Sequence, residues 1–374
     1  MHRRAFLQQS LGAPALIAKW KMGPPRPYFQ ELTTLMRAAP VPGAVVGAVA
    51  GHKPAWIAPL GVRAPGSSAV TASTLFQAAS LTKQFTAYAV LALRERGKLD
   101  LDRPVVEYVD GLPNPEARKV TARHILSHSS GFPNWRFAEA SKPLPELAPA
   151  FPPGTKFQYS GEGFFYLQRV LERISGTGFG QVLRDVVFDP LDMKSSTVVW
   201  DPATLDRTAL PHGRHGEARP NWEKSARAAR AFAERAGKPV ERLTYEDYSQ
   251  VPREAGDPAL PNWMQPNAAS SLITSAEDYT RFLIAAMRNP EIGKQQVTIN
   301  EFLGWGLGWG IERMNGRSWL WQWGDNGGYK NFVLAEPATG DALFVFTNGD
   351  SGARIYDRVL THATGCDHPA LFWV

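Results

Sequence analysis

Two residues at helical spacing, Ser80 and Lys83, are the first candidates for chemistry. They stand at the head of a run, Leu81 to Leu93, in which apolar residues recur every four positions, as they do in a helix. Residues i and i+3 of a helix lie one above the other, so the Lys83 amine can reach the Ser80 hydroxyl. A neutral lysine would remove the hydroxyl proton, provided that burial and the positive end of the helix dipole lower its pKa. The alternative is that Ser80 only caps the helix and Lys83 is solvated.

A tyrosine is the second candidate. Tyr159 follows the turn-forming sequence Pro153-Gly154-Thr155 and precedes an apolar-patterned helix, Phe164 to Ile174. A phenol close to a lysine can be held partly as phenolate, because the neighbouring cation favours the charged form. Such a tyrosine would carry protons for a serine. The alternative is a tyrosine of the core or its rim.

A glycine-rich stretch near the end of the chain is the third candidate. In "WQWGDNGGYKNF", Gly324, Gly327 and Gly328 allow the backbone to approach a ligand closely. The functional interpretation is that this edge supplies a backbone N–H group to an oxyanion hole. The alternative is a tight β turn without a ligand.

The elements that must position these residues are β, then helical, then β again. Two strands are predicted at "VPGAVVGAVAG" and "PAWIAPLG", and four more at "GLGWGIER", "SWLWQW", "KNFVLAEP" and "ALFVFTNG". Helical patches and Pro/Gly-rich connections fill the chain from Leu101 to about Asn267, and a helix with Ser275 as a plausible cap follows. The order predicts an α+β fold: an antiparallel sheet flanked by helices, completed by both chain ends, with an inserted mainly helical domain. We expect the α/β part at about 23–78 and 270–374 and the helical part at about 79–269.

The composition argues against several other classes. The chain has 374 residues, 44% hydrophobic and 20% charged, which is ordinary for a globular protein. Its net charge is +6, but the basic residues in mid-chain alternate with glutamates and no nucleic-acid module signature is present, so we expect a solvated face and no nucleic-acid partner. The single cysteine, Cys366, excludes an intrachain disulfide and a multi-cysteine zinc site.

The first 22 residues are similar to a leader. They contain the pair Arg3-Arg4, a short apolar stretch from Leu11 to Ala18, and small residues at Ala13 and Ala15, as in a twin-arginine export signal. We therefore expect a periplasmic or secreted protein, with an ordinary terminus and a cytoplasmic protein as the alternative. The apolar stretch is too short to span a bilayer, and we expect no integral membrane segment.

Five blocks in order resemble the serine β-lactamase and penicillin-binding protein family, in its class C β-lactamase and family VIII esterase-like branch. The resemblance covers roughly residues 40–357. S-x-x-K, here Ser80 to Lys83, is a known signature of this superfamily. The blocks are "LFQAASLTKQFTA", "HILSHSSGF", "PPGTKFQYSGEGF", "SSLITSAEDYTRFL" and, at the place of the third motif, "WGDNGG".

The sequence departs from the family pattern twice. Gly161 stands where the class C pattern has Asn or Ser, so a side-chain contact to the substrate is missing. Asp325 stands where the third motif carries Lys or His. An aspartate about 4 Å from a substrate carboxylate costs on the order of 1 to 4 kcal/mol, which argues against efficient hydrolysis of anionic β-lactams. Lys330 would offset that charge if it folds back.

The resemblance implies a serine hydrolase that acts by acyl transfer on a small ester, amide or β-lactam-type carbonyl. Ser80 would attack the carbonyl, Lys83 and Tyr159 would relay its proton, with Tyr159 the preferred base for deacylation, and the N–H groups of Ser80 and Gly328 would hold the oxyanion. The residues expected to contact the substrate are Gly161, Asp325, Asn326 and Gly327. The partner is then a small-molecule substrate; no cofactor and no metal are expected, and the sequence does not specify an oligomeric state.

Three other interpretations are open at this stage. A metallohydrolase would use His124 and His128, or His212 and His215, but Ile125 occupies the place where H-E-x-x-H has its glutamate. A Ser-His-Asp hydrolase would need G-x-S-x-G, which the chain lacks. A penicillin-binding or sensor-like protein of the same fold would acylate with little or no turnover.

Overall fold

The computed structural model describes residues 23, 26–137, 144–219, 222–250 and 265–374. The predicted leader, residues 1–22, lies outside these residues, so export stays a prediction. Within the described ranges, the helices are too short or too polar to cross a membrane.

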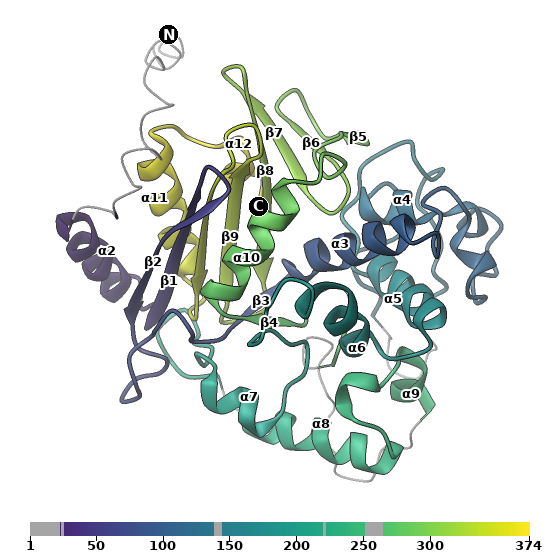
Figure 1. Ribbon diagram of the computed structural model, residues 1–374, viewed down its shortest axis with the longest axis horizontal. Coiled ribbons are helices and arrows are strands. Elements are labelled where there is room, and N and C mark those ends of the chain that lie inside the picture. Colours follow the sequence, from purple (N-terminus) through teal and green to yellow (C-terminus); the bar gives the residue numbers. More distant parts are fainter. Residues whose placement is uncertain (1–22, 24–25, 138–143, 220–221, 251–264) are drawn as a thin grey trace.

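A single antiparallel sheet joins the two ends of the chain. In the described residues it has eight strands in the order β2-β1-β10-β9-β8-β7-β6-β5 (Figure 1). The N-terminal β1 pairs with the late β10, with Ala44 opposite Thr347 and Val49 opposite Ala342. The predicted α+β fold, with an antiparallel sheet completed by both chain ends, is confirmed. The strands are β1 Gly43–Ala50, β2 Lys53–Gly61, β5 Val297–Thr298, β6 Leu303–Trp305, β7 Gly310–Met314, β8 Arg317–Asp325, β9 Lys330–Glu336 and β10 Asp341–Thr347.

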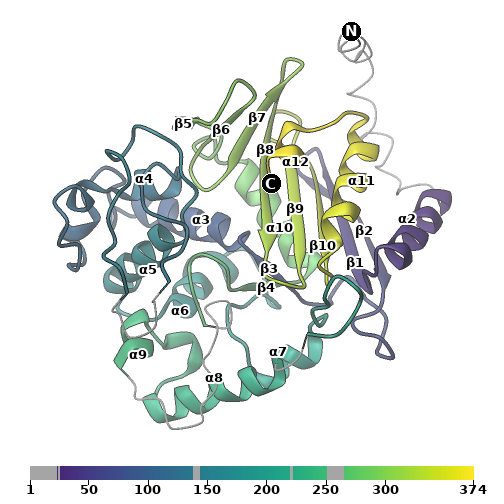
Figure 2. The same ribbon diagram turned by 180° about the vertical axis from the view of Figure 1, so that it is seen from behind.

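Both faces of the central strands are covered by helices, which explains why these strands are apolar at nearly every position. Successive side chains of a strand point to opposite faces, so Phe344 and Phe346 of β10 belong to one core and Leu343 and Val345 to another. The first core includes α10 (Ala276–Met287). The second includes α2 (Arg26–Ala38), α11 (Gly352–Thr364) and α12 (Pro369–Trp373), on the face turned to the viewer in Figure 2.

The chain between β2 and β5 is mainly helical, with one small second sheet at its two ends. This sheet pairs β3 (Phe76–Ala79) with β4 (Leu272–Thr274), so it lies where the sequence predicts the two parts to meet. The helices between these strands are α3 Thr82–Glu95, α4 Ala122–Leu126, α5 Glu162–Ser175, α6 Phe179–Leu183, α7 Pro202–Arg207, α8 Trp222–Ala236 and α9 Tyr245–Gln250. Shorter helical segments are η2 Val105–Glu107, η3 Ala117–Lys119, η4 Arg184–Phe188 and η5 Val240–Arg242.

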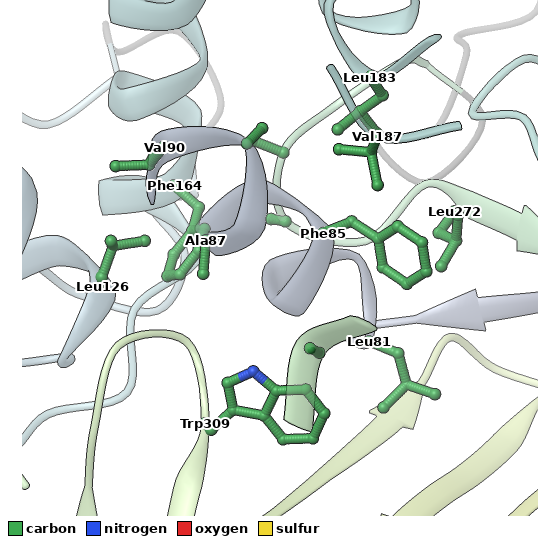
Figure 3. Close-up of a cluster of buried hydrophobic side chains, with 14 of the residues drawn as sticks. Leu81, Phe85, Ala87, Val90, Leu126, Phe164, Leu183, Val187, Leu272 and Trp309 are labelled. Atoms are coloured by element: carbon green, nitrogen blue, oxygen red, sulfur yellow. The ribbon is translucent and has the colours of Figure 1, made fainter. Parts of the chain in front are cut away.

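Helix α3 runs through the middle of the molecule. Figure 3 shows Phe85, Ala87 and Val90 of α3 among side chains of other elements. These include Phe164 of α5, Val187 of η4 and Trp309, which directly precedes β7, and all of them are buried. A helix that is buried on nearly all sides is held by packing and not by its intrinsic helix propensity. The residues at its N-terminus are therefore fixed against the sheet.

A buried ion pair fastens the C-terminus to the sheet. The Nδ1 atom of His368 lies 2.8 Å from Oε1 of Glu312 on β7, and the other Glu312 oxygen accepts the Ala370 N–H at 3.0 Å. Burial alone would lower the pKa of His368, but hydrogen bonds with Cys366 and Glu312 and the Glu312 charge raise it to about 9. The C-terminal helix α12 is thus anchored by a histidine that is charged at neutral pH.

We predict that the stability supplied by His368 depends on pH. Its pKa is about 9 in the folded state and near 6.5 when unfolded, so its contribution is full below pH 6.5 and is lost as the pH rises through 9. At 1.36 kcal/mol per pKa unit, His368→Gln should lower the free energy of unfolding by about 3 kcal/mol at pH 6. Urea denaturation at pH 6 and pH 9.5 measures this, and an equal loss at both values would contradict the assignment.

Candidate active site

Ser80 lies in a tight turn between β3 and α3. The preceding Ala79 has a φ of +51°, a left-handed conformation that is uncommon for a residue with a side chain. The N-cap position of α3 belongs to Leu81, and no side chain caps this end. Thr82 fixes the turn, since its hydroxyl donates to the Ala79 carbonyl at 2.6 Å and accepts the Leu272 N–H at 2.9 Å. The structure therefore gives Ser80 no capping role and holds it on a strained turn.

Lys83 is completely buried below Ser80. Its Nζ donates to Ser80 Oγ at 3.1 Å and to the Ala269 carbonyl at 2.9 Å. It also lies 4.9 Å from the centre of the Tyr159 ring and 5.4 Å from that of Phe164. No carboxylate in the described part of the chain forms an ion pair with it, and burial lowers the pKa of Lys83 to about 7. A substantial fraction of the amine is therefore neutral near pH 7.

Tyr159 reaches the same serine from the loop before α5. Its hydroxyl forms a hydrogen bond with Ser80 and accepts one from Gln322 Nε2 at 3.5 Å. Burial raises the pKa of Tyr159 above its ordinary value, and the two hydrogen bonds only partly oppose this. The predicted partial phenolate is therefore wrong: Tyr159 is a neutral phenol, and the group with the lowered pKa is Lys83.

The histidines of the metallohydrolase interpretation have other partners. His128 Nδ1 accepts the Ser160 N–H at 3.0 Å, and its ring lies 4.1 Å from that of Tyr159. Burial, followed by the Lys83 charge, lowers its pKa well below the ordinary value, so His128 is neutral. His124 Nδ1 accepts the Thr121 N–H in a capping box. Within the described ranges, no three His, Cys, Asp or Glu side chains group closely enough to hold a metal ion.

Strand β8 supplies a residue that the sequence analysis missed, Gln322. Its Nε2 donates to the Ser80 carbonyl at 3.3 Å as well as to Tyr159. The side chain is buried on the face opposite Trp321 and Trp323. A polar residue inside the aromatic run "WLWQW" is the sequence signal that could have identified it, because strand alternation places it on the other face.

The same part of β8 has a free edge close to the serine. Strand β7 begins at Gly310, opposite Trp321, so the β7–β8 ladder of the described residues does not extend to residues 322–325. At Gly324, a Cβ atom would lie 2.2 Å from the Ala78 carbonyl, so only glycine allows this close approach to β3. In an antiparallel ladder, alternate N–H groups of this segment point away from β9.

Of the residues predicted for the third motif, Asp325 is the last residue of this edge and the others lie beyond it. Asp325 forms an ion pair with Lys330 at 2.5 Å, and Asn326 Nδ2 donates to the Ser270 carbonyl at 2.8 Å. Gly327 lies beside Arg219. The Gly328 N–H, predicted as an oxyanion donor, is taken by the Asp350 carboxylate, which also binds Arg219. This prediction is corrected, because a turn N–H committed to a carboxylate is not free for substrate.

A tryptophan fills the space next to Gly161. A Cβ atom at Gly161 would lie 2.4 Å from the Trp135 ring, and the Gly161 N–H donates to Asn134 Oδ1 at 3.0 Å. The missing side chain is therefore replaced by an aromatic ring from the loop before it. This ring leaves no room for the polar side chain of the class C pattern.

Half-buried aromatic rings continue outward from Tyr159. Trp323 lies 4.6 Å from Tyr159 between ring centres, and Trp373 of α12 lies 5.5 Å from Trp323 and 5.6 Å from Phe157. Three other tryptophans are buried in the core, namely Trp305, Trp309 and Trp321. Tyr159 thus connects Ser80 to an aromatic surface of half-buried rings, which consists of Trp323, Trp373 and Phe157.

We predict that Gly161 and Trp135 are coupled. Gly161→Asn alone should lower the free energy of unfolding by about 1 to 3 kcal/mol, because the new side chain overlaps the Trp135 ring. In a Trp135→Ala background the same change should cost much less. Urea denaturation of the wild type, both single variants and the double variant measures the coupling. Additive losses would show that the ring does not determine the residue at 161.

Comparison with known proteins identifies the family. The model of the Beta-lactamase family matches residues 30–364. The chain is 28% identical over 321 residues to penicillin-binding protein 4 of Amycolatopsis lactamdurans, covering 79% of this chain and 78% of that protein. It is 29% identical over 244 residues to esterase EstB of Burkholderia gladioli, covering 58% of each. The D-alanine carboxypeptidase AmpC of Burkholderia cenocepacia has the same fold, with a TM-score of 0.67, 18% identity, and coverage of 91% of this chain and 99% of that one. The chain therefore belongs to the beta-lactamase family of serine hydrolases.

Proposed function

We propose that this hydrolase cleaves small neutral esters through an acyl-enzyme on Ser80. The observation that carries the proposal is the hydrogen bond from a buried lysine with a pKa of about 7 to the serine hydroxyl. Neutral Lys83 accepts the Ser80 proton as Oγ attacks the ester carbonyl, and the C–O bond to the alcohol then breaks. The alcohol leaves with a proton passed on from Lys83 through the Tyr159 hydroxyl.

Deacylation uses the same groups in our proposal. A water molecule attacks the acyl-enzyme and gives its proton to Lys83, with the Tyr159 hydroxyl between them, and Ser80 regains a proton as the acid leaves. This differs from the sequence-based prediction of Tyr159 as the base, since the raised pKa of Tyr159 makes a phenolate costly at neutral pH. The oxyanion donors we propose are the Ser80 N–H and an N–H of the free edge of β8.

The charges around the site favour a neutral substrate. Lys330 is paired with Asp325, and Arg219 with Asp350, so neither cation near the turn is left to bind a carboxylate. The aromatic surface formed by Trp323, Trp373 and Phe157 offers an apolar contact instead. An esterase is among the relatives, beside a penicillin-binding protein and a carboxypeptidase, so an ester substrate is within the range of activities named in the family.

We predict that a serine-directed fluorophosphonate forms one adduct, on Ser80. Lys83→Ala should slow this labelling about a hundredfold or more, because the general base is lost. The labelling rate of the wild type should rise with pH through about 7, where Lys83 becomes neutral. Intact-mass spectrometry with peptide mapping measures both, and Ser80→Ala is the control. If Lys83→Ala is labelled at the wild-type rate, Ser80 is not an activated nucleophile.

A separate measurement tests the sensor-like alternative. A first turnover of p-nitrophenyl butyrate that is not followed by steady-state turnover would favour that alternative.

We predict that substrate charge changes the rate. For p-nitrophenyl butyrate, kcat/KM should be about tenfold or more above that for mono-p-nitrophenyl succinate, because the succinate carboxylate finds Lys330 and Arg219 already paired with aspartates. Asp325→Asn should narrow the gap, because it leaves Lys330 without its partner and so able to bind the carboxylate. The ratio of the two kcat/KM values is the measurement. An equal or faster reaction with the succinate ester would contradict a site for neutral substrates.

A further inference from the structure

The Ala269 carbonyl that binds Lys83 belongs to a short buried segment, residues 266–271. The direction of this carbonyl determines whether the lysine amine stays within reach of Ser80, because Lys83 Nζ donates to both the carbonyl and Ser80 Oγ. We propose that Gln168 of α5 is a positioning residue that holds this segment and thereby the Lys83 amine. This inference rests on the proposed function of Lys83 as the base.

Both ends of the Gln168 side chain bind the segment. Its Nε2 donates to the Pro266 carbonyl at 3.2 Å, and its Oε1 accepts the Ala268 N–H at 3.1 Å. Gln168 is 1% exposed, so water does not compete for these bonds. The amide therefore clamps the segment at the two residues that flank Asn267, just before Ala269.

Glu172, one turn further along α5, fixes which way the Gln168 amide points. Its Oε1 accepts from Gln168 Nε2 at 2.8 Å and from the Phe179 N–H at 3.2 Å, while its Oε2 accepts the Tyr245 N–H at 2.9 Å. Because the carboxylate faces N–H donors only, the amide nitrogen of Gln168 must point toward it and the amide oxygen toward Ala268. The orientation of the Gln168 amide is thus determined by Glu172.

Other contacts complete the hold on the segment. Asn267 Oδ1 accepts the Ala269 N–H at 2.9 Å and the Ser270 N–H at 2.7 Å. From α3, the Thr86 hydroxyl donates to the Ala268 carbonyl at 2.8 Å. With both neighbouring peptide groups fixed, the Ala269 carbonyl has one direction, toward Lys83.

The same helix begins shortly after Tyr159. Tyr159 is three residues before α5 begins at Glu162, and Gln168 lies in the second turn of the helix. One rigid helix therefore sets the place of the phenol and, through Gln168, the place of the carbonyl that holds the amine. A shift of α5 would move both partners of Ser80 together.

The clamp has a consequence that a purely structural role would not have. A carbonyl that accepts from Lys83 favours the charged ammonium, so moving it away lowers the pKa of Lys83. Among the described residues, the titratable side chains beside Lys83 are His128 and Tyr159; both are neutral near pH 7, and neither belongs to the segment. The rate of Ser80 labelling rises with pH as Lys83 becomes neutral, and we call this rise the acid limb. Loosening the clamp should therefore move the midpoint of the acid limb to lower pH and also slow the reaction.

The test compares Gln168→Met with Gln181→Met in the full chain. Gln181 of α6 is a matched control, because it donates to Asp185 four residues on at 2.7 Å, as Gln168 does to Glu172, but does not contact the segment. The rate of fluorophosphonate labelling of Ser80 is measured from pH 5.5 to 9. We expect Gln168→Met to lower the plateau about tenfold and to move the midpoint down by about half a pH unit or more. Gln181→Met should leave both unchanged.

A midpoint equal to that of the wild type would overturn the proposal, whatever the plateau. If Gln168→Met does not fold, as shown by thermal unfolding, Thr86→Val loosens the same segment from α3 and should move the midpoint in the same direction; no shift would again overturn it. Burial also raises the pKa of Glu172 to about 7, and Glu172→Gln should keep the acid limb, since the limb belongs to Lys83. Failure of the proposed function is seen separately, in a wild type without an acid limb or in Lys83→Ala labelling at the wild-type rate.

Discussion

The burial of one lysine without a carboxylate is the constraint on which the site depends. Removing an ammonium from water costs several kcal/mol, and an ion pair would offset that cost but would also hold the lysine protonated. Lys83 has instead a carbonyl, a hydroxyl and two aromatic faces, from Tyr159 and Phe164. These contacts stabilise the amine enough to keep it in place and too little to keep it charged. The result is an amine with a pKa of about 7, which can act as the base that we propose.

The elements around the lysine are held under strain that the rest of the fold must offset. Ala79 and His128 both have side chains and both adopt left-handed conformations, with φ of +51° and +53°. Each such residue costs on the order of 1 to 3 kcal/mol and persists only where its surroundings leave no alternative. Ala79 presents Ser80, and His128 binds the N–H next to Tyr159. The buried helix α3 and the two-sided sheet supply the packing that keeps both turns in place.

The sequence predicted the parts of the fold that have a period. The strands β1, β2, β7, β8, β9 and β10 and the helices α3, α5 and α10 were expected from the pattern of apolar residues and the turn and cap residues that bound them. Strands β3 and β4 were not, because three or four residues are too few to show an alternation. Yet these two strands carry the turn that presents Ser80.

The site was predictable where it is local and not where it depends on distant contacts. Ser80 and Lys83 are neighbours along one turn, so their spacing is visible in the sequence. The raised pKa of Tyr159 comes from burial, and the loss of the Gly328 N–H comes from Asp350, twenty-two residues away. Neither can be read from a motif. Gln322 had a local signal, since it is a polar residue inside an aromatic strand. The sequence analysis instead chose Asp325, three residues later, because of the glycines around it, whereas the side chain that contacts Ser80 and Tyr159 is Gln322.

The identity of residue 322 connects the base to the choice of substrate. A cation at this position would lie beside Tyr159 and near Lys83, where a like charge would lower the pKa of the lysine further and where it would also attract an anionic substrate. The amide of Gln322 donates the same hydrogen bonds without the charge. In our proposal, Gln322 thus adds no cation beside Lys83, whose pKa is lowered by burial, and no charge that would recognise a carboxylate. One neutral side chain on β8 is compatible both with the proposed neutral substrate and with the proposed lysine base.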